Sequence, residues 1–317
     1  MPLTKIFFTS DVHGSDVCFI KFLNAAKFYQ ANVLILGGDI TGKLVIPIVQ
    51  QPTGTYTSEF GGTTHTLKTK GERDELEKKI RDSGFYPYMT NPEEMEKLTN
   101  DTKLRDELFS RLMAEGVRRW VGMAEEKLKG TNTKCYISPG NDDAFIIDDL
   151  LKSSSSVLYP EDQVIQIDGH HEMITSAWTN ATPWKTPRET TEEKLAEMLD
   201  RMTSKVQNME SCIFNLHCPP YDTIIDVAPE LDENFTPKVS GSTVKMIHVG
   251  STAVRDAIAK KQPLLGIHGH IHESQGFVKI GRTLCINPGS DYGEGILRGA
   301  LINLDEKGIK SYMLTQG

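Results

Sequence analysis

The chain has 317 residues, a net charge of −8 at pH 7, and hydrophobic and charged fractions of 38% and 25%. This composition is typical of a soluble globular protein, and the length suits one large α/β domain or two smaller ones. The acidic balance argues against a nucleic-acid partner, because such binding depends on Lys and Arg neutralising phosphates. The sequence has no long apolar run, no signal-peptide pattern and no CxxC pair, so it predicts a cytoplasmic protein without a membrane span.

Short apolar runs rich in β-forming residues recur along the chain and predict strands buried on both faces. Those that end in polar turns are 5–10, 32–36, 134–138, 212–216 and 263–267. A helix-like segment over 17–29 makes a βαβ unit of the first two strands. Further helices are expected over 190–208 and from Ser251 or Thr252 to Lys261, where a Ser or Thr N-cap precedes the helix. Antiparallel strands are expected at 276–280, 283–286, 299–304 and 308–314.

Residues about 68–130 interrupt this succession of strands. The segment is highly charged and has no apolar strand-like run, and in 72–81 and 103–129 opposite charges recur three or four residues apart. This pattern predicts a helical insertion at about 68–130, between the second and third core strands. The whole chain, 1–317, is then expected to form a single domain.

Polar residues with metal-ligating side chains follow the ends of the predicted strands. Those residues are Asp11, His13, Asp39, Asn141, His217, His270 and His272. In open α/β sheets the ligand crevice lies outside the carboxyl ends of the strands, so these side chains are expected to converge. Nitrogen and oxygen donors of this kind suit Mn, Fe, Zn or Ni better than Ca. Each residue also has an ordinary interpretation, as an Asx turn, a helix cap or a satisfied core histidine.

The order and type of these residues resemble the five-block pattern DxH, GD, GN[H], H and GHxH of the calcineurin-like metallophosphoesterase superfamily. The blocks are 11–13, 38–39, 140–142, 217 and 269–272, and the sequence at 248–251 and 286–290 resembles the Icc-related predicted phosphoesterases. The resemblance implies an α/β (α+β) fold, a four-layer αββα sandwich of two mixed sheets flanked by helices. It also implies two divalent metal ions, Mn or Fe with Zn or Ni as alternatives.

By the same resemblance, the two metals would share the seven residues. The first would be held by Asp11, His13, Asp39 and His272. The second would be held by Asp39, Asn141, His217 and His270, with Asp39 as the bridge. The implied activity is metal-dependent hydrolysis of phosphomonoesters or phosphodiesters, in which a metal-bridging hydroxide attacks phosphorus. The expected partner is a small phosphoester or nucleotide-like substrate, and the oligomeric state is left open, a homodimer included.

Asp142 departs from the family pattern, in which a histidine often follows the asparagine. A carboxylate at this position would repel an incoming phosphate unless its pKa were raised enough for it to act as a general acid. His268 lies on the same alternating face as His270 and His272 and is a second candidate for a supporting catalytic role. The departure at Asp142 leaves an alternative function open, namely a non-catalytic or weakly active metal-binding scaffold of the same fold.

Overall fold

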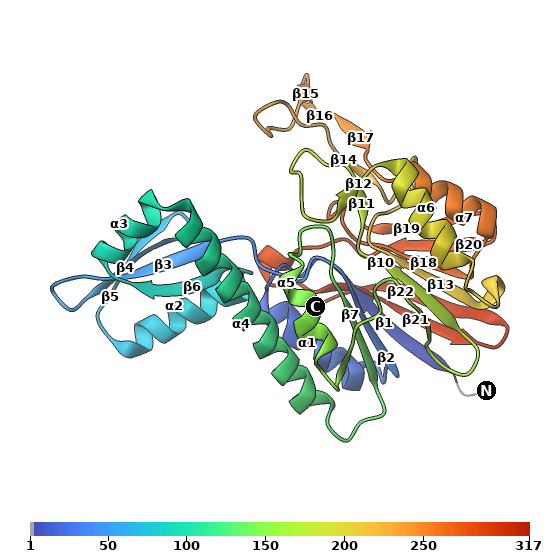
Figure 1. The fold of residues 1–317 in the computed structure, drawn as a ribbon, viewed down its shortest axis with the longest axis horizontal. Helices are drawn as coiled ribbons and strands as arrows, with labels where there is room; N and C mark the ends of the chain where they lie inside the picture. Colours follow the sequence, from blue (N-terminus) through green and yellow to red (C-terminus); the bar gives the residue numbers. More distant parts are fainter. Residues whose placement is uncertain (1–2) are drawn as a thin grey trace.

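The computed structural model describes residues 3–317, and its centre is formed by two six-stranded sheets (Figure 1). The first sheet has the order β22-β21-β1-β2-β7-β8. Its strands, in chain order, are β1 (Thr4–Thr9), β2 (Val33–Gly37), β7 (Lys134–Ser138), β8 (Val157–Leu158), β21 (Arg298–Asp305) and β22 (Gly308–Gln316). Strands β1, β2, β7 and β8 pair in parallel, whereas β21 pairs antiparallel with both β1 and β22. The sheet is therefore mixed.

The second sheet has the order β19-β20-β18-β13-β10-β9. Its strands are β9 (Val164–Gln166), β10 (Glu172–Ser176), β13 (Cys212–Leu216), β18 (Leu265–Ile267), β19 (Gly276–Ile280) and β20 (Thr283–Asn287). The four central strands are parallel, and the edge strands β9 and β19 are antiparallel to their neighbours. This sheet is also mixed.

The two sheets pack face to face and helices cover their outer faces. Phe8 and Ile35 of the first sheet belong to one buried cluster with Ile213 and Ile267 of the second. On the other face of the first sheet lie α1 (Asp16–Phe28), α5 (Ile146–Lys152) and the C-terminal part of a long helix, α4 (Thr102–Leu128). The second sheet is covered by α6 (Glu192–Thr203) and α7 (Thr252–Lys261). The predicted αββα sandwich of two mixed sheets is confirmed.

Serine N-caps mark the first residues of two of these helices. Ser15 caps α1 by accepting from the Cys18 backbone N–H at 3.4 Å, and Ser251 caps α7 by accepting from Val254 N–H at 3.1 Å. In α1, Phe19 is fully buried and stacks on Trp120 of α4 with ring centroids 4.1 Å apart. The prediction of α7 is confirmed, whereas α6 is shorter than the expected 190–208, and a 3-10 turn, η1 (Met209–Ser211), precedes β13.

The insertion requires a correction. The expected helices lie in it as α2 (Lys70–Asp82), α3 (Pro92–Asn100) and α4, but a strand, β6 (Tyr86–Thr90), lies in the same range. β6 joins three strands that precede the predicted segment, and the sheet order is β5-β4-β3-β6. These strands are β3 (Val45–Gln50), β4 (Tyr56–Phe60) and β5 (Thr63–Leu67). That the whole chain forms one domain stays a prediction.

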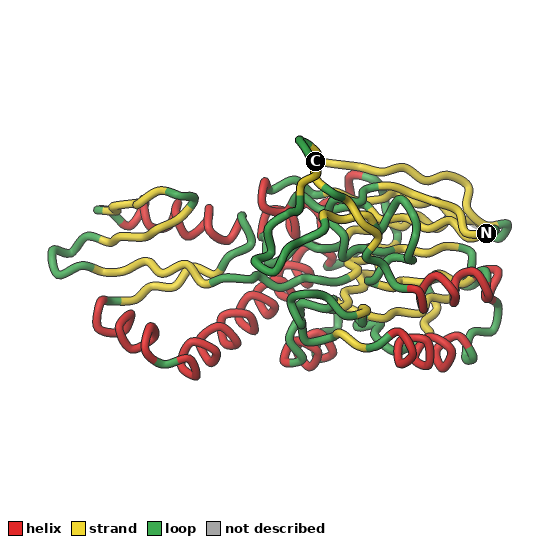
Figure 2. The backbone as a smooth tube through the Cα atoms, turned by 90° about the horizontal axis from the view of Figure 1, so that it is seen from above, coloured by secondary structure: helices red, strands yellow, loops and turns green. Residues whose placement is uncertain are grey.

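The strands of this appendage were missed because few of their side chains are buried. From these strands Ile48 and Leu67 are buried in the local core with Leu76 and Ile80 of α2, and the other apolar side chains that pack against it are partly exposed. β3 has an apolar run over 45–49, but β4, β5 and β6 carry mainly Thr, Tyr and other polar residues, so no continuous apolar run marks those three strands. Figures 1 and 2 show this small sheet and its helices, which we call the appendage (residues 45–100), extending away from the two large sheets.

Short strand pairs complete the fold. β11 (Thr179–Asn180) pairs with β12 (Glu189–Thr190), β14 (Val227–Pro229) pairs with β17 (Met246–His248), and β15 (Val239–Ser240) pairs with β16 (Thr243–Val244). A second 3-10 turn is η2 (Tyr292–Glu294). In the part of the chain that the structure describes, no helix is long and apolar enough to cross a membrane. The five cysteines are unpaired and buried.

Candidate metal centre

The seven predicted ligands lie on loops at the carboxyl ends of five strands. Asp11 and His13 follow β1, Asp39 follows β2, and Asn141 follows β7, so the first sheet supplies four of the seven. The others come from the second sheet, where His217 follows β13 and His270 and His272 follow β18. β1, β2 and β7 are parallel to one another, and so are β13 and β18, so the ends that carry these residues share one edge of each sheet, and the face-to-face packing brings the two edges together.

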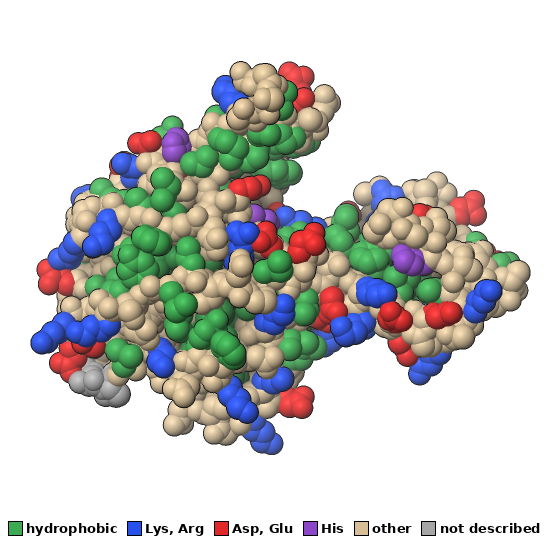
Figure 3. Space-filling view, turned by 180° about the vertical axis from the view of Figure 1, so that it is seen from behind, with side chains coloured by type: hydrophobic (Ala, Val, Ile, Leu, Met, Phe, Trp, Pro, Cys, Tyr) green, Lys and Arg blue, Asp and Glu red, His purple; other side chains and the backbone are tan. Residues whose placement is uncertain are grey.

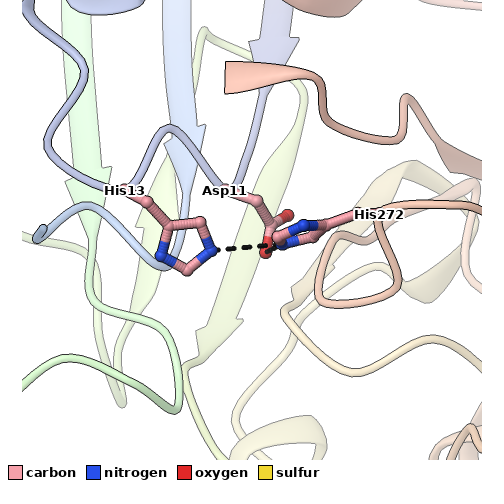
Figure 4. A group of neighbouring side chains, drawn as sticks. All are labelled: Asp11, His13 and His272. Atoms are coloured by element: carbon pink, nitrogen blue, oxygen red, sulfur yellow. Dashed lines mark hydrogen bonds and ion pairs between the residues drawn. The ribbon is translucent and has the colours of Figure 1, made fainter. Parts of the chain in front are cut away.

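Three of these residues form a first donor group, shown in Figure 4 with their side chains pointing toward one another. In this group Asp11, His13 and His272 each place one ligand atom within 4.8 Å of the others. The Nε2 atoms of the two histidines are 3.1 Å apart, and His272 Nε2 is 3.5 Å from Asp11 Oδ1. One cation can therefore contact all three side chains.

Asp39, His217 and His270 form a second donor group with the same spacing. His217 Nε2 is 3.4 Å from Asp39 Oδ2, and the same oxygen is 3.7 Å from His13 Nε2 of the first group. Asp39 therefore lies between the two groups. The structure thus brings together three of the residues that the sequence analysis placed at each metal, and the role of Asp39 as a bridge stays a prediction.

Asn141 presents an amide oxygen that has no partner in the protein. Its side chain is buried, and its Nδ2 donates to Thr186 Oγ1 at 2.8 Å, while Oδ1 has no hydrogen-bond partner. His217 Nε2 is likewise buried and without a hydrogen bond, because Nδ1 donates to the Gly37 carbonyl at 3.0 Å. Buried polar atoms are nearly always satisfied, so these two atoms without partners are available to coordinate a cation. The residues present fit a divalent metal.

The backbone at four of these residues has an unusual conformation. Asp11, His13, Asp39 and His270 have φ angles of 56°, 39°, 49° and 68°. Non-glycine residues rarely adopt positive φ, and such conformations persist only where the surroundings impose them. Their concentration among the predicted ligands indicates that the loops are shaped to aim these side chains inward.

Glycines in the motifs allow the loops to approach so closely. A Cβ on Gly140 would lie 2.2 Å from Asp39 Oδ1, and one on Gly269 would lie 2.3 Å from Asp11 Oδ2. At Gly38, which has a φ of 127°, a Cβ would lie 2.3 Å from His217 Nδ1. The glycines that precede Asp39, Asn141 and His270 are therefore required by contact with another ligand.

Hydrogen bonds from the main chain orient the two carboxylates. The backbone N–H of His270 donates to both oxygens of Asp11, at 3.1 and 3.0 Å, and the N–H of Asp142 donates to Asp39 Oδ1 at 2.9 Å. Asp143, which the sequence analysis did not select, is fully buried and accepts from the N–H groups of Thr41 and Gly140. It thereby ties the loop that carries Asp39 to the loop that carries Asn141.

Burial and mutual attraction set the charges of the cluster. Burial disfavours the charged forms of Asp11 and Asp39, but His217 beside them keeps both pKa values below the usual range. For His217, burial opposes protonation, yet Asp39 and Asp11 raise its pKa to about 10. Burial lowers the pKa of His13 to about 3. The cluster thus combines ionised carboxylates with imidazole nitrogens, and a cation would displace the proton from His217.

Asp142 lies at the edge of the cluster and is paired with a residue that sequence reasoning missed. Its Oδ2 is 2.8 Å from Lys43 Nζ, and one of its oxygens lies within 4.8 Å of donor atoms of His13 and Asp39. Burial and the neighbouring Asp39 raise the pKa of Asp142, and Lys43 opposes that rise. Lys43 follows the Asp39 loop in a Thr-Gly-Lys sequence that has no distinguishing pattern. Only the fold reveals this ion pair.

His268 belongs to neither donor group. It is fully buried, and its Nδ1 lies 2.8 Å from the Leu216 carbonyl and 3.1 Å from the Cys218 carbonyl. These two residues flank His217, so His268 supports the loop that presents this ligand. The structure places it as a positioning residue and does not bring it to the donor atoms.

Tyr292 is a third residue that the sequence analysis did not select. Its ring centroid lies 4.7 Å from that of His13 and 6.0 Å from that of His272. Nearby, Ser290 Oγ donates to the Asp11 carbonyl at 2.6 Å. The loop after β20 therefore covers one side of the first donor group.

Comparisons with known proteins bear on the fold. No protein-family model matches the chain. An uncharacterised protein, MJ1162 of Methanocaldococcus jannaschii, is 33% identical over 153 residues, which is 47% of this chain and 61% of that protein. The chain thus matches less than two thirds of the length of this relative.

Solved structures align over almost the whole chain. One crystal structure covers 99% of this chain and 99% of its own, with a TM-score of 0.61 and 16% identity. A second, described as a novel archaeal phosphodiesterase, covers 99% and 100% with 13% identity but a TM-score of only 0.33, so the argument on fold depends on the first. The alignment with the first structure and the αββα topology show the fold, which is the one implied by the resemblance to the calcineurin-like metallophosphoesterase superfamily.

Proposed function

We propose that this protein is a metal-dependent hydrolase that cleaves phosphoester bonds in small, nucleotide-like substrates. The observation that carries the proposal is the convergence of two carboxylates, four imidazoles and one unpartnered amide oxygen at the strand ends. Such a donor set, buried and shaped by strained loops, has no purely structural explanation, because converging imidazoles and an orphaned amide are costly without a cation.

Two divalent cations account for the donors. The first cation would be held by Asp11, His13 and His272. The second cation would be held by His217, His270 and Asn141. Asp39 would contact both cations. Mn or Fe is the proposed pair, with Zn or Ni as alternatives that the same donors accept. When bound, two such cations acidify water and neutralise charge on a phosphoryl group, which is the chemistry that hydrolysis of a phosphoester requires.

The protein's own residues provide charge and orientation for the substrate. Lys43 is paired with Asp142, and 43% of its side chain is exposed, so its ammonium can also contact a phosphate oxygen. The same ion pair offsets the negative charge at Asp142, which would otherwise repel a phosphate. Lys43 thereby supplies an anion-binding group near the position at which the family pattern often has a histidine.

The proposal is tested by restoring metal and measuring both content and turnover. Protein loaded with Mn, Fe, Zn or Ni should carry close to two metal equivalents and hydrolyse some member of a panel of phosphomonoesters, cyclic nucleotides and other phosphodiesters. His13→Ala should lose metal and activity, whereas His65→Ala in β5 of the appendage is the matched control and should keep both. Stoichiometric metal without turnover of any ester would favour a metal-binding scaffold and overturn the assignment as a hydrolase.

A further inference from the structure

A cavity of about 430 Å³ lies between the appendage and the loop that carries Tyr292. Ile46, Phe60 and Phe85 form its apolar wall on the appendage side, and Tyr292 forms part of the opposite wall. Figure 3 shows the recess between the appendage and the rest of the molecule, in which hydrophobic and charged side chains gather. This volume is within the range of small-molecule sites and exceeds that of a single phosphate group.

The cavity and the candidate metal centre share a wall. The ring of Tyr292 lines the cavity and also lies 4.7 Å, centroid to centroid, from the ring of His13. On the appendage side, Ser83 and Phe85 line the cavity, and the glycine between them is so close to the centre that a Cβ would lie 2.3 Å from the His13 carbonyl oxygen. A substrate with its phosphate at the metals therefore has the cavity within reach of its next group.

The lining of the cavity selects the chemical class of that group. None of the described residues that line it is Lys, Arg or His, and Glu59 brings a negative charge to it, so it does not suit a phosphate. The rings of Phe60 and Phe85 meet edge to face, with centroids 6.2 Å apart and an interplanar angle of 80°. Together with Tyr292 they present aromatic surfaces to a ligand, and aromatic surfaces bind planar rings well.

We propose that this cavity binds a planar aromatic group of the substrate, of nucleobase or aryl type, while the phosphate occupies the metal centre. The inference depends on the proposed function for the position of the phosphate. It deepens that function by naming an aromatic phosphoester as the substrate class and the appendage as the element that recognises it.

The test compares binding of two matched phosphonates, whose C–P bonds are not hydrolysed, to metal-loaded protein by titration calorimetry. Wild type should bind naphthylphosphonate at least about tenfold more tightly than methylphosphonate, the usual effect of stacking on aromatic side chains. An adenine-bearing alkylphosphonate, run in parallel, distinguishes a nucleobase from a simple aryl group. Equal affinity of wild type for all three phosphonates would overturn the inference.

Two variants locate the binding group. Phe60→Ala removes part of the wall and Ser83→Trp fills the cavity, so both should reduce the preference for aromatic ligands about tenfold and leave methylphosphonate binding unchanged. Phe28→Ala, at a residue of α1 that is 79% exposed, is the matched control and should change neither affinity. If Phe60→Ala unfolds the appendage, Ser83→Trp still tests whether the cavity binds the aromatic group. An aromatic preference that survives in a folded Ser83→Trp protein would contradict the inference.

The outcomes separate this inference from the proposed function. If no ester is hydrolysed but naphthylphosphonate still binds through the cavity, the hydrolase assignment fails and the aromatic site stands. If esters are hydrolysed but Ser83→Trp leaves the aromatic preference intact, the cavity is rejected and the hydrolase assignment stands.

Discussion

Asp39 is the residue on which both donor groups depend. Its Oδ2 lies 3.7 Å from His13 Nε2 and 3.4 Å from His217 Nε2, while its Oδ1 accepts the backbone N–H of Asp142. It is 3% exposed, so water cannot replace it without rearrangement of the loops. One carboxylate thus links residues from both sheets.

Replacing Asp39 with alanine should remove both metal equivalents, because each proposed metal loses an oxygen ligand and the repulsion between two cations is no longer shielded. Elemental analysis and turnover of the best substrate provide the measurements, and both should fall to background. Asp232→Ala, on the exposed loop before β15, is the control and should keep full metal content. If the Asp39 variant retained two metals, Asp39 would not be the bridge.

Lys43 and Asp142 should be coupled in turnover. Lys43→Met removes the ammonium and leaves the Asp142 carboxylate unpaired near the phosphate, so KM should rise by about tenfold or more. Asp142→Asn keeps the ammonium and should cost less. The double variant, Lys43→Met with Asp142→Asn, has no unpaired carboxylate. Part of the loss in kcat/KM that Lys43→Met causes should therefore be recovered in it. Additive effects of the two substitutions would show that the pair does not act as a unit.

At the scale of elements, the strand-end turns decide the geometry of the centre. Each turn after β1, β2, β7 and β18 contains a motif residue, and in three of the four a glycine directly precedes it. These glycines are packed against ligands from other turns, as Gly140 is against Asp39. The turns therefore form one interlocked unit, and a change in one moves the ligands of another.

Gly140→Ala should show this coupling. The new methyl group would lie 2.2 Å from Asp39 Oδ1 and 2.3 Å from Asp39 N, so the bridge must shift. We expect a stability loss of about 1–3 kcal/mol, typical of overpacking, together with at least about tenfold weaker metal binding. The control is Gly122→Ala in α4, where nothing lies within 4 Å of the new Cβ and stability should rise by about 0.5–1 kcal/mol. Unchanged metal affinity in the Gly140 variant would contradict the interlocked arrangement.

At the scale of the whole molecule, polar contacts join the two sheets away from the metal centre. Glu161, which follows β8 of the first sheet, accepts the backbone N–H of Ala177 through both oxygens, at 3.0 and 2.9 Å, just after β10 of the second. It also lines a cavity of about 310 Å³ together with Arg188. Arg188 in turn donates its backbone N–H to the Asn141 carbonyl at 3.2 Å, so this region also supports the loop that carries Asn141.

Burial raises the pKa of Glu161 to about 8, above its ordinary value of 4.5, and this shift predicts a pH dependence of stability. Below pH 4.5 the carboxyl group of Glu161 is protonated in both the folded and the unfolded chain, so it does not lower the free energy of unfolding. Between pH 4.5 and 8 only the unfolded chain releases the proton, so stability falls as the pH rises through this window. Glu161→Gln should therefore raise the Tm, and the gain should grow from pH 5 to pH 8.5.

Thermal unfolding of both proteins across this pH range provides the measurement. Glu126→Gln, at an exposed position on α4, is the control and should give a difference from wild type that does not change with pH. A pH-independent effect of Glu161→Gln would show that the carboxyl group is ionised in the folded protein throughout the range.

The sequence by itself determined the elements whose signals are local. The apolar runs of β1, β2, β7, β13 and β18, the capped helix α7 and the motif residues at the strand ends were all recognisable, because strand burial and cap chemistry are encoded by neighbouring residues. The αββα arrangement followed from the resemblance carried by those motifs.

Tertiary structure alone decided the features that depend on contacts between distant segments. The strands β3–β6 bury few side chains and pair with one another, and β4, β5 and β6 have no apolar run that would distinguish them from loops. Lys43 acquires its role from Asp142, about a hundred positions away in the chain, and Tyr292 from His13, which is more distant still. A local pattern records which face of an element is buried, but it does not record which distant side chain will lie against it. Those neighbours are fixed only when the two sheets pack and their strand ends meet.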